Sequence, residues 1–127
     1  MKIKTSEATG LQLDWGVAVV LGVKPKVYCG RVETDQTDEN YWAVRREFDH
    51  TDPAVCMGLI EQYSLAFSEC DTRHLYDKPD TLWRVVCRDG SGYGESASLA
   101  EAVARCVIAM RLGDEFEVPD SLLGEEK

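Results

Sequence analysis

The chain has 127 residues, of which 29% are charged and 44% hydrophobic, and its net charge at pH 7 is −9. This composition is typical of one globular domain and excludes a largely disordered chain. The acidic excess disfavours binding to nucleic acids and to anionic membranes, which attract Lys and Arg. We therefore expect a single domain over residues 1–127, with residues 124–127 as a frayed end.

Several features indicate a cytoplasmic protein. The first ten residues lack the apolar segment of a secretory signal, and the longest apolar run, residues 15–23, is too short to cross a bilayer. The five cysteines are odd in number and widely spaced, which favours free thiols over a disulfide framework. Cys70 with His74, and His50 with Cys56, lack the paired short spacings of zinc sites, so we expect neither a metal nor a cofactor.

The first half of the chain predicts a helix followed by a hairpin. The helix covers residues 9–21 and is apolar on most sides, which indicates packing against more than one neighbour. Residues 26–34 and 41–48 are rich in strand-forming residues and flank a polar turn at 35–40. Gly30 interrupts the first strand and predicts a bulge or a close approach of another backbone.

The middle of the chain predicts a short helix and a second group of strands. The helix covers residues 53–63 and begins after Asp52, an N-cap residue followed by a proline. The elements after it are a brief strand at 65–67, a loop at 69–79, a strand at 82–88, a turn at 89–92 and a return strand from Tyr93.

An amphipathic helix follows at residues 98–112. Ser98 and Glu101 form the Ser-x-x-Glu pattern of a capping box, and Gly113 is suited to end the helix. Its core-facing stripe consists of Leu99, Ala102, Val103, Cys106, Val107, Ala109 and Met110. With helices at both ends, the chain predicts an α+β fold: a small, mostly antiparallel sheet packed against the N-terminal and C-terminal helices, with one short middle helix.

Ile108 and Leu112 lie opposite the core-facing stripe and would be left in water unless something covers them. Two coverings are open: the chain's own tail, through Leu122 and Leu123, or a second copy of the chain. We favour a homodimer in which the tail takes part.

Both ends of the chain resemble small phage and prophage proteins of the NinX-like family, a domain family of unknown function. The matching segments cover about a third of the chain: Lys4-Thr5-Ser6-Glu7, Gly10, Leu13-Asp14-Trp15, Val17-Ala18, Arg105-Cys106, Leu112-Gly113-Asp114-Glu115 and Glu117-Val118-Pro119. The middle differs, because this chain has Gly58-Leu59-Ile60-Glu61 where family members often carry a tryptophan and a Gly-Gly-Pro before an Ile-Ile-Glu-like segment. The resemblance implies a phage or prophage product in bacterial cytoplasm, and it implies no reaction.

Two groups of residues are candidate binding sites. Asp14 is a poor helix former inside an apolar helix, so we expect it to pair with an arginine, with Arg105 as the partner and Trp15 beside it. A structural ion pair explains the same pattern. Arg84 lies with Arg88 on one face of a predicted strand, where a phosphate or an acidic partner could dock, although such a face is often simply the solvated side of a sheet.

We therefore expect an accessory protein without catalytic activity that acts by contact with an unidentified host or phage protein. The alternative is a small-molecule or nucleotide-binding domain with a pocket lined by aspartate and arginine. A concave pocket with convergent polar groups would favour the alternative, and an exposed apolar patch would favour protein contact. Mimicry of a nucleic acid by the acidic surface is a third possibility, which requires the acidic residues to gather on one face.

Overall fold

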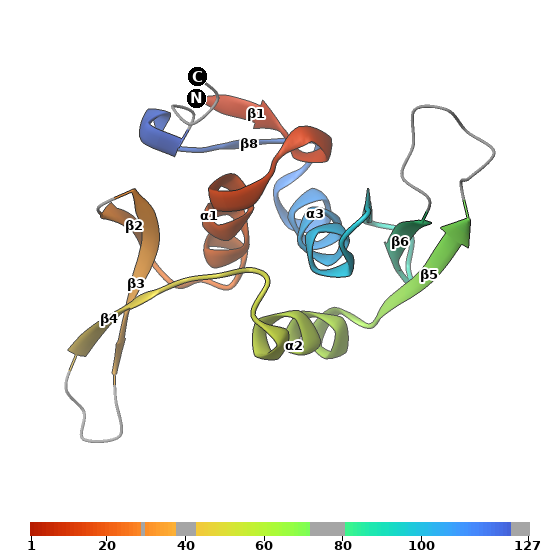
Figure 1. Ribbon diagram of the computed structural model, residues 1–127, viewed down its shortest axis with the longest axis horizontal. Helices are drawn as coiled ribbons and strands as arrows, with labels where there is room; N and C mark the ends of the chain where they lie inside the picture. The colour runs from red at the N-terminus through yellow and green to blue at the C-terminus, as the bar shows by residue number, and fades with distance from the viewer. Residues whose placement is uncertain (29, 38–42, 72–80, 123–127) are drawn as a thin grey trace.

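The computed structural model describes residues 1–28, 30–37, 43–71 and 81–122. Across these residues the fold is α+β, as the sequence predicts. Helices α1 (Gly10–Val20) and α3 (Leu99–Leu112) lie side by side at the centre of the molecule, and α2 (Pro53–Tyr63) packs against α3 (Figure 1). The bounds of all three helices agree with the predicted ones to within one or two residues. The strands within these described ranges form three small antiparallel sheets, where the sequence suggested one.

The first sheet joins the two ends of the described chain. Strand β1 (Lys2–Lys4) pairs with β8 (Glu115–Glu117), so that Lys2 lies opposite Glu117 and Lys4 opposite Glu115. The amino terminus of Met1 donates to the carbonyl of Val118 at 2.9 Å. This pairing holds β1 next to the C-terminal end of α3. The short helices η1 (Thr5–Glu7) and η2 (Asp120–Leu122) flank the sheet.

The second sheet has the order β2-β3-β4, with β2 at Pro25–Tyr28, β3 at Arg31–Thr37 and β4 at Ala43–Glu47. Gly30 lies between β2 and β3 with a φ of 76°, a conformation that glycine adopts without strain. The predicted bulge at this position is therefore wrong, because Gly30 instead allows a tight hairpin turn. The predicted polar turn at 35–40 is also wrong over residues 35–37, which continue β3.

The third sheet has the order β5-β6-β7, with β5 at Leu65–Asp71, β6 at Thr81–Cys87 and β7 at Tyr93–Ser96. β5 is longer than predicted and occupies the start of the predicted loop at 69–79, most of which lies outside the described residues. Strand β7 lies so close to α3 that a side chain at position 94 would collide with the backbone of that helix. The absence of a side chain there sets the close approach.

Helix α3 is buried on more than one side, and this corrects the prediction that Ile108 lies outside the core and is covered by the tail or by a second copy. Ile108 is fully buried because it packs against Gly16 of α1, where an added Cβ would lie only 2.5 Å from the Ile108 Cδ1 atom. Leu122 is also buried, while Leu112 is 37% exposed. Leu123 lies outside the described residues. Ile108 and Leu122 are therefore part of the chain's own core, and the predicted dimer loses most of the surface on which it was based.

Candidate functional site

A cleft of about 1300 Å³ lies between the sheet of β1 and β8 and the sheet of β5, β6 and β7. Its walls are β1 and η1 on one side and the segment from Gly90 to Ala97, which includes β7, on the other. Helix α3 contributes Arg105 and Ala109 between these walls. The cleft therefore lies between edge strands of two separate sheets, with a helix beneath them.

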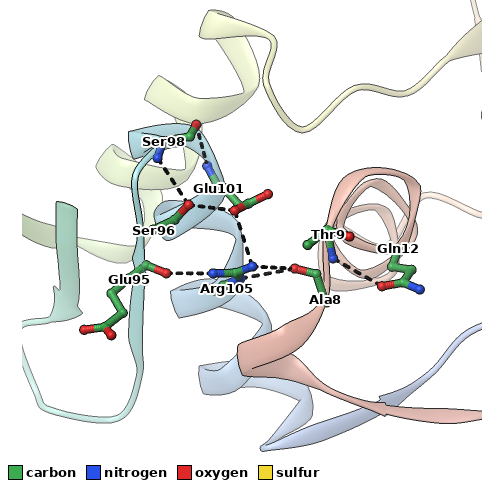
Figure 2. A network of polar contacts seen from close by, with 8 residues as sticks. All are labelled: Ala8, Thr9, Gln12, Glu95, Ser96, Ser98, Glu101 and Arg105. Atoms are coloured by element: carbon green, nitrogen blue, oxygen red, sulfur yellow. Dashed lines mark hydrogen bonds and ion pairs between the residues drawn. The ribbon is translucent and has the colours of Figure 1, made fainter. Parts of the chain in front are cut away.

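Arg105 holds the walls of the cleft together (Figure 2). Its Nε and Nη2 atoms donate to the carbonyl of Ala8, at 3.1 and 2.9 Å, and its Nη1 atom donates to the carbonyl of Glu95 at 2.8 Å. Nη2 also lies 3.3 Å from Glu101 Oε1. The planar guanidinium thus joins the segment before α1, strand β7 and α3. Arg105 is therefore a clamp between segments that are distant in sequence.

The capping contacts of α3 support this clamp. Ser98 Oγ accepts from the N–H of Glu101 at 3.4 Å, which is half of the predicted capping box. The other half is not formed, because the Glu101 carboxylate accepts from Ser96 Oγ at 2.6 Å and pairs with Arg105. Ser96 Oγ in turn accepts from the N–H of Ser98 at 3.2 Å, as Figure 2 shows. Glu101 is thus held by Ser96 and orients Arg105.

The cleft presents free charges of both signs at its walls. Lys2 and Lys4 share one face of β1 and are exposed. Asp114 and Glu115 line the cleft from the C-terminal side. Within the described part of the chain, none of these four side chains has a salt bridge. Glu95, in contrast, is engaged, because its carboxylate accepts from the Tyr93 hydroxyl at 2.5 Å and lies 3.7 Å from Arg84 Nε.

Strand β7 presents part of its backbone to the cleft. The N–H of Cys87 donates to the carbonyl of Gly92 at 3.2 Å, which fixes the alternation of hydrogen bonds between β6 and β7. In this alternation, Glu95 directs its backbone groups away from β6. The bond from Arg105 to the Glu95 carbonyl agrees with that direction. The edge of β7 therefore faces the cleft with one of its carbonyls already occupied.

Asp14 does not pair with Arg105, and this predicted pair is wrong. Asp14 Oδ1 instead accepts from the backbone N–H of His50 at 2.8 Å and lies 2.6 Å from His50 Nδ1. Both residues are buried, at 7% and 5% exposure. The partners of this buried carboxylate are therefore an imidazole and a backbone N–H and not the expected arginine. They reach Asp14 because the loop before α2 passes over α1. The neighbouring Asp49 is exposed, and hydrogen bonds from the hydroxyl and N–H of Thr51 lower the pKa of its carboxyl.

The other candidate residues lie apart from these two features. Trp15 is partly buried against the core and does not line the cleft. Arg84 is exposed on the solvent side of the third sheet, and its neighbour Arg88 is exposed as well. Arg84 reaches the cleft only through its ion pair with Glu95. The sequence analysis missed Lys2 and Lys4, since isolated lysines near a terminus carry no local signal that distinguishes them from other surface residues.

Three cysteines belong to the part of the chain whose side chains the structure describes, and all three are free thiols: Cys56, Cys87 and Cys106. Burial raises the pKa of the Cys56 thiol, and burial together with the nearby Cys87 raises the pKa of Cys106 to about 11. The Cys56 and Cys106 thiols are therefore protonated and poorly nucleophilic at neutral pH.

No helix in the described residues has both the length and the apolar character needed to span a membrane. No protein-family model matches the chain, and a search of curated proteins gives no match. The resemblance to the NinX-like family therefore depends on the segments quoted above.

Proposed function

We propose that this chain is a binding protein without catalytic activity, a phage or prophage accessory protein that contacts a host or phage protein in the bacterial cytoplasm. Its cleft is the docking surface, and the occupant is an extended segment of the partner polypeptide. The observation that supports this proposal is the position of the cleft between the edge strands of two sheets. Extended peptides commonly bind along such strand edges.

The charges of the cleft favour a polypeptide over a nucleotide. A nucleotide or nucleic acid carries only negative charge near its phosphates, and it would meet Asp114 and Glu115 as well as Lys2 and Lys4. A peptide segment with both acidic and basic side chains can pair with charges of both signs. The volume of about 1300 Å³ also exceeds the range of about 300–1000 Å³ that is usual for small-molecule pockets.

The alternative, a small-molecule or nucleotide site lined by Asp14 and Arg105, has less support. Asp14 is bonded to His50, and Arg105 donates to two backbone carbonyls and to Glu101. The two residues do not meet in one pocket, and the nitrogen atoms of Arg105 are already engaged within the protein.

Site-specific photo-crosslinking tests the docking surface. A photoreactive residue replaces Ser91, which is exposed at the cleft, and a control carries the same residue in place of Glu61 on α2, which is exposed outside the cleft. In cells that express the chain together with the phage genes, we expect position 91 to crosslink to a defined polypeptide and position 61 not to do so. Equal crosslinking from both positions would contradict the proposal.

Charge removal provides a second test. Lys2→Gln combined with Lys4→Gln removes two charges from the cleft wall, and Lys24→Gln combined with Arg111→Gln removes two exposed charges elsewhere. We expect the first pair to weaken the crosslink from position 91 and the second pair to preserve it. If a nucleotide or another small molecule displaced the partner at the cleft, the alternative function would be supported instead.

A further inference from the structure

The fold brings together three potential metal ligands, none of which lines the cleft. Asp14 of α1 lies beside Asp49 and His50, which precede α2, and one ligand atom from each of the three lies within 4.8 Å of the other two. Two of the three residues are buried, whereas Asp49 is exposed. An imidazole and two carboxylates form a mixed nitrogen and oxygen donor set.

The hydrogen bonds around this cluster leave ligand atoms available. Asp14 and Asp49 each use only Oδ1 in side-chain hydrogen bonds within the described residues. The second carboxylate oxygen of each therefore has no partner there. No buried side-chain nitrogen or oxygen in the described residues lacks a partner, so Asp14 Oδ2 keeps some contact with solvent although its residue is 93% buried. A solvent-accessible oxygen on a buried carboxylate gives an ion a path to the cluster.

The distances and charges suit a divalent ion. Donors that bind one tetrahedral zinc ion at about 2.1 Å each lie about 3.4 Å apart. The ligand atoms of the cluster lie within 4.8 Å of one another, so side-chain rotations that shorten the widest separation by up to about 1.4 Å would bring the donors to this spacing. The two carboxylates supply two negative charges, which balance a divalent cation in a place where a buried charge needs a partner. Within the described residues, the Thr51 hydroxyl and N–H donate to Asp49 and orient its carboxylate. Metal ligands are often oriented by such hydrogen-bond partners.

We propose that Asp14, Asp49 and His50 bind a divalent transition-metal ion, with His50 Nδ1 and one oxygen from each carboxylate as ligands. The ion displaces the proton shared by His50 Nδ1 and Asp14 Oδ1, and the two atoms move apart from 2.6 Å to the spacing of metal donors. A neutral imidazole carries that proton on Nε2 instead, and an imidazolium releases one proton to solvent. Three protein ligands leave at least one position for water. The bound ion connects α1 to the loop that begins α2.

Titration of the intact protein with Co²⁺, and then with Zn²⁺, tests this site. The protein is first stripped with a chelator and kept reduced, and binding is followed by calorimetry and by the visible absorption of Co²⁺. We expect one ion per chain and a rise in the melting temperature when Zn²⁺ is present. Since thiolate ligands give Co²⁺ an intense near-ultraviolet charge-transfer band, its absence separates this site from the cysteines.

Two substitutions locate the ion. Asp49→Asn removes a ligand charge from an exposed residue yet keeps the oxygen that accepts from Thr51, so the apo protein should fold normally. Asp89→Asn is the matched control, because Asp89 makes the same kind of bond to Ser91 in the turn between β6 and β7. We expect Asp49→Asn to weaken binding by roughly tenfold or more and Asp89→Asn to leave it unchanged.

The contrary results are equally clear. Binding that Asp49→Asn leaves unchanged, or that carries the thiolate band, would overturn the assignment, as would a wild-type chain that shows no saturable binding of either ion. His50→Gln adds a second check: binding retained in that variant would exclude the imidazole as a ligand. If His50→Gln fails to fold, Asp49→Asn alone decides the assignment.

Discussion

The packing of α1 on α3 can be tested with two glycine-to-alanine substitutions. Gly16 lies within α1, and a Cβ added there would lie 2.5 Å from Ile108 Cδ1 and 2.9 Å from Phe116 Cε2. Gly58 lies within α2, and a Cβ added there would meet nothing within 4 Å. Both glycines are inside helices, so the two substitutions share the change in helix propensity and differ in the space available.

The expected free energies follow from these contacts. Alanine is favoured over glycine inside a helix by about 1 kcal/mol, so Gly58→Ala should stabilise the protein by up to that amount. At Gly16 the same gain is opposed by overpacking, which typically costs about 1–3 kcal/mol in a well-packed core. Ile108 is fully buried and has little room to move. We therefore expect Gly16→Ala to be destabilising on balance, by about 1 kcal/mol, and to be about 2 kcal/mol less stable than Gly58→Ala.

Urea denaturation followed by circular dichroism measures both free energies of unfolding. A double variant, Gly16→Ala with Ile108→Val, removes the Cδ1 atom that makes the closest contact. Ile→Val alone costs about 0.5–1.5 kcal/mol, so a double variant more stable than the sum of the two single changes would show that the two residues are in contact. Equal stabilisation by Gly16→Ala and Gly58→Ala would refute the described packing of α1 on α3.

Three further outcomes are expected. Ile108→Glu should prevent folding or lower the melting temperature strongly because it buries a charge, whereas Leu112→Glu should have little effect at a partly exposed position. Similar melting temperatures for the two variants would mean that Ile108 is not in the core. Ser98→Ala should lower the free energy of unfolding by about 0.5–1 kcal/mol, since its bond to the Glu101 N–H is long at 3.4 Å, and an unchanged urea midpoint would remove Ser98 as the cap. In the native protein at pH 8 we expect Cys106, whose pKa is about 11, to react with a thiol reagent much more slowly than the partly exposed Cys56. Peptide mapping of the labelled protein measures both rates. Faster labelling of Cys106 than of Cys56 would contradict the burial of Cys106.

Local signals in the sequence predicted the helices well. Asp52 is an N-cap that accepts from the Ala54 N–H at 2.9 Å, and Pro53 occupies the first helical position, as their order predicts. Gly113 ends α3, as predicted, with a φ of 100°. These signals are reliable because they act between residues within one helical turn and need no information about the rest of the chain.

The arrangement of the strands and helices was less predictable. The pairing of β1 with β8 joins residues more than a hundred positions apart, and each strand has only three residues. The neighbour that covers Ile108 was misjudged for a related reason. Helical periodicity identifies the faces of a helix but not how many neighbours pack against it, and α3 contacts α1, α2, β6 and β7.

The pairing of Asp14 shows where residue-by-residue reasoning reaches its limit. An aspartate inside an apolar helix implies a compensating partner, because an unpaired buried carboxylate is costly, and the sequence does predict that a partner exists. The sequence does not identify which cation or hydrogen-bond donor is the partner of Asp14, since the partner depends on which loop crosses the helix. Arg105 satisfies two backbone carbonyls at the cleft, and His50 arrives with its neighbour Asp49 because Asp52 and Pro53 start α2 immediately afterwards. The start of one helix thus determines which residues approach another. This is why the candidate metal ligands and the cleft became evident only from the folded arrangement.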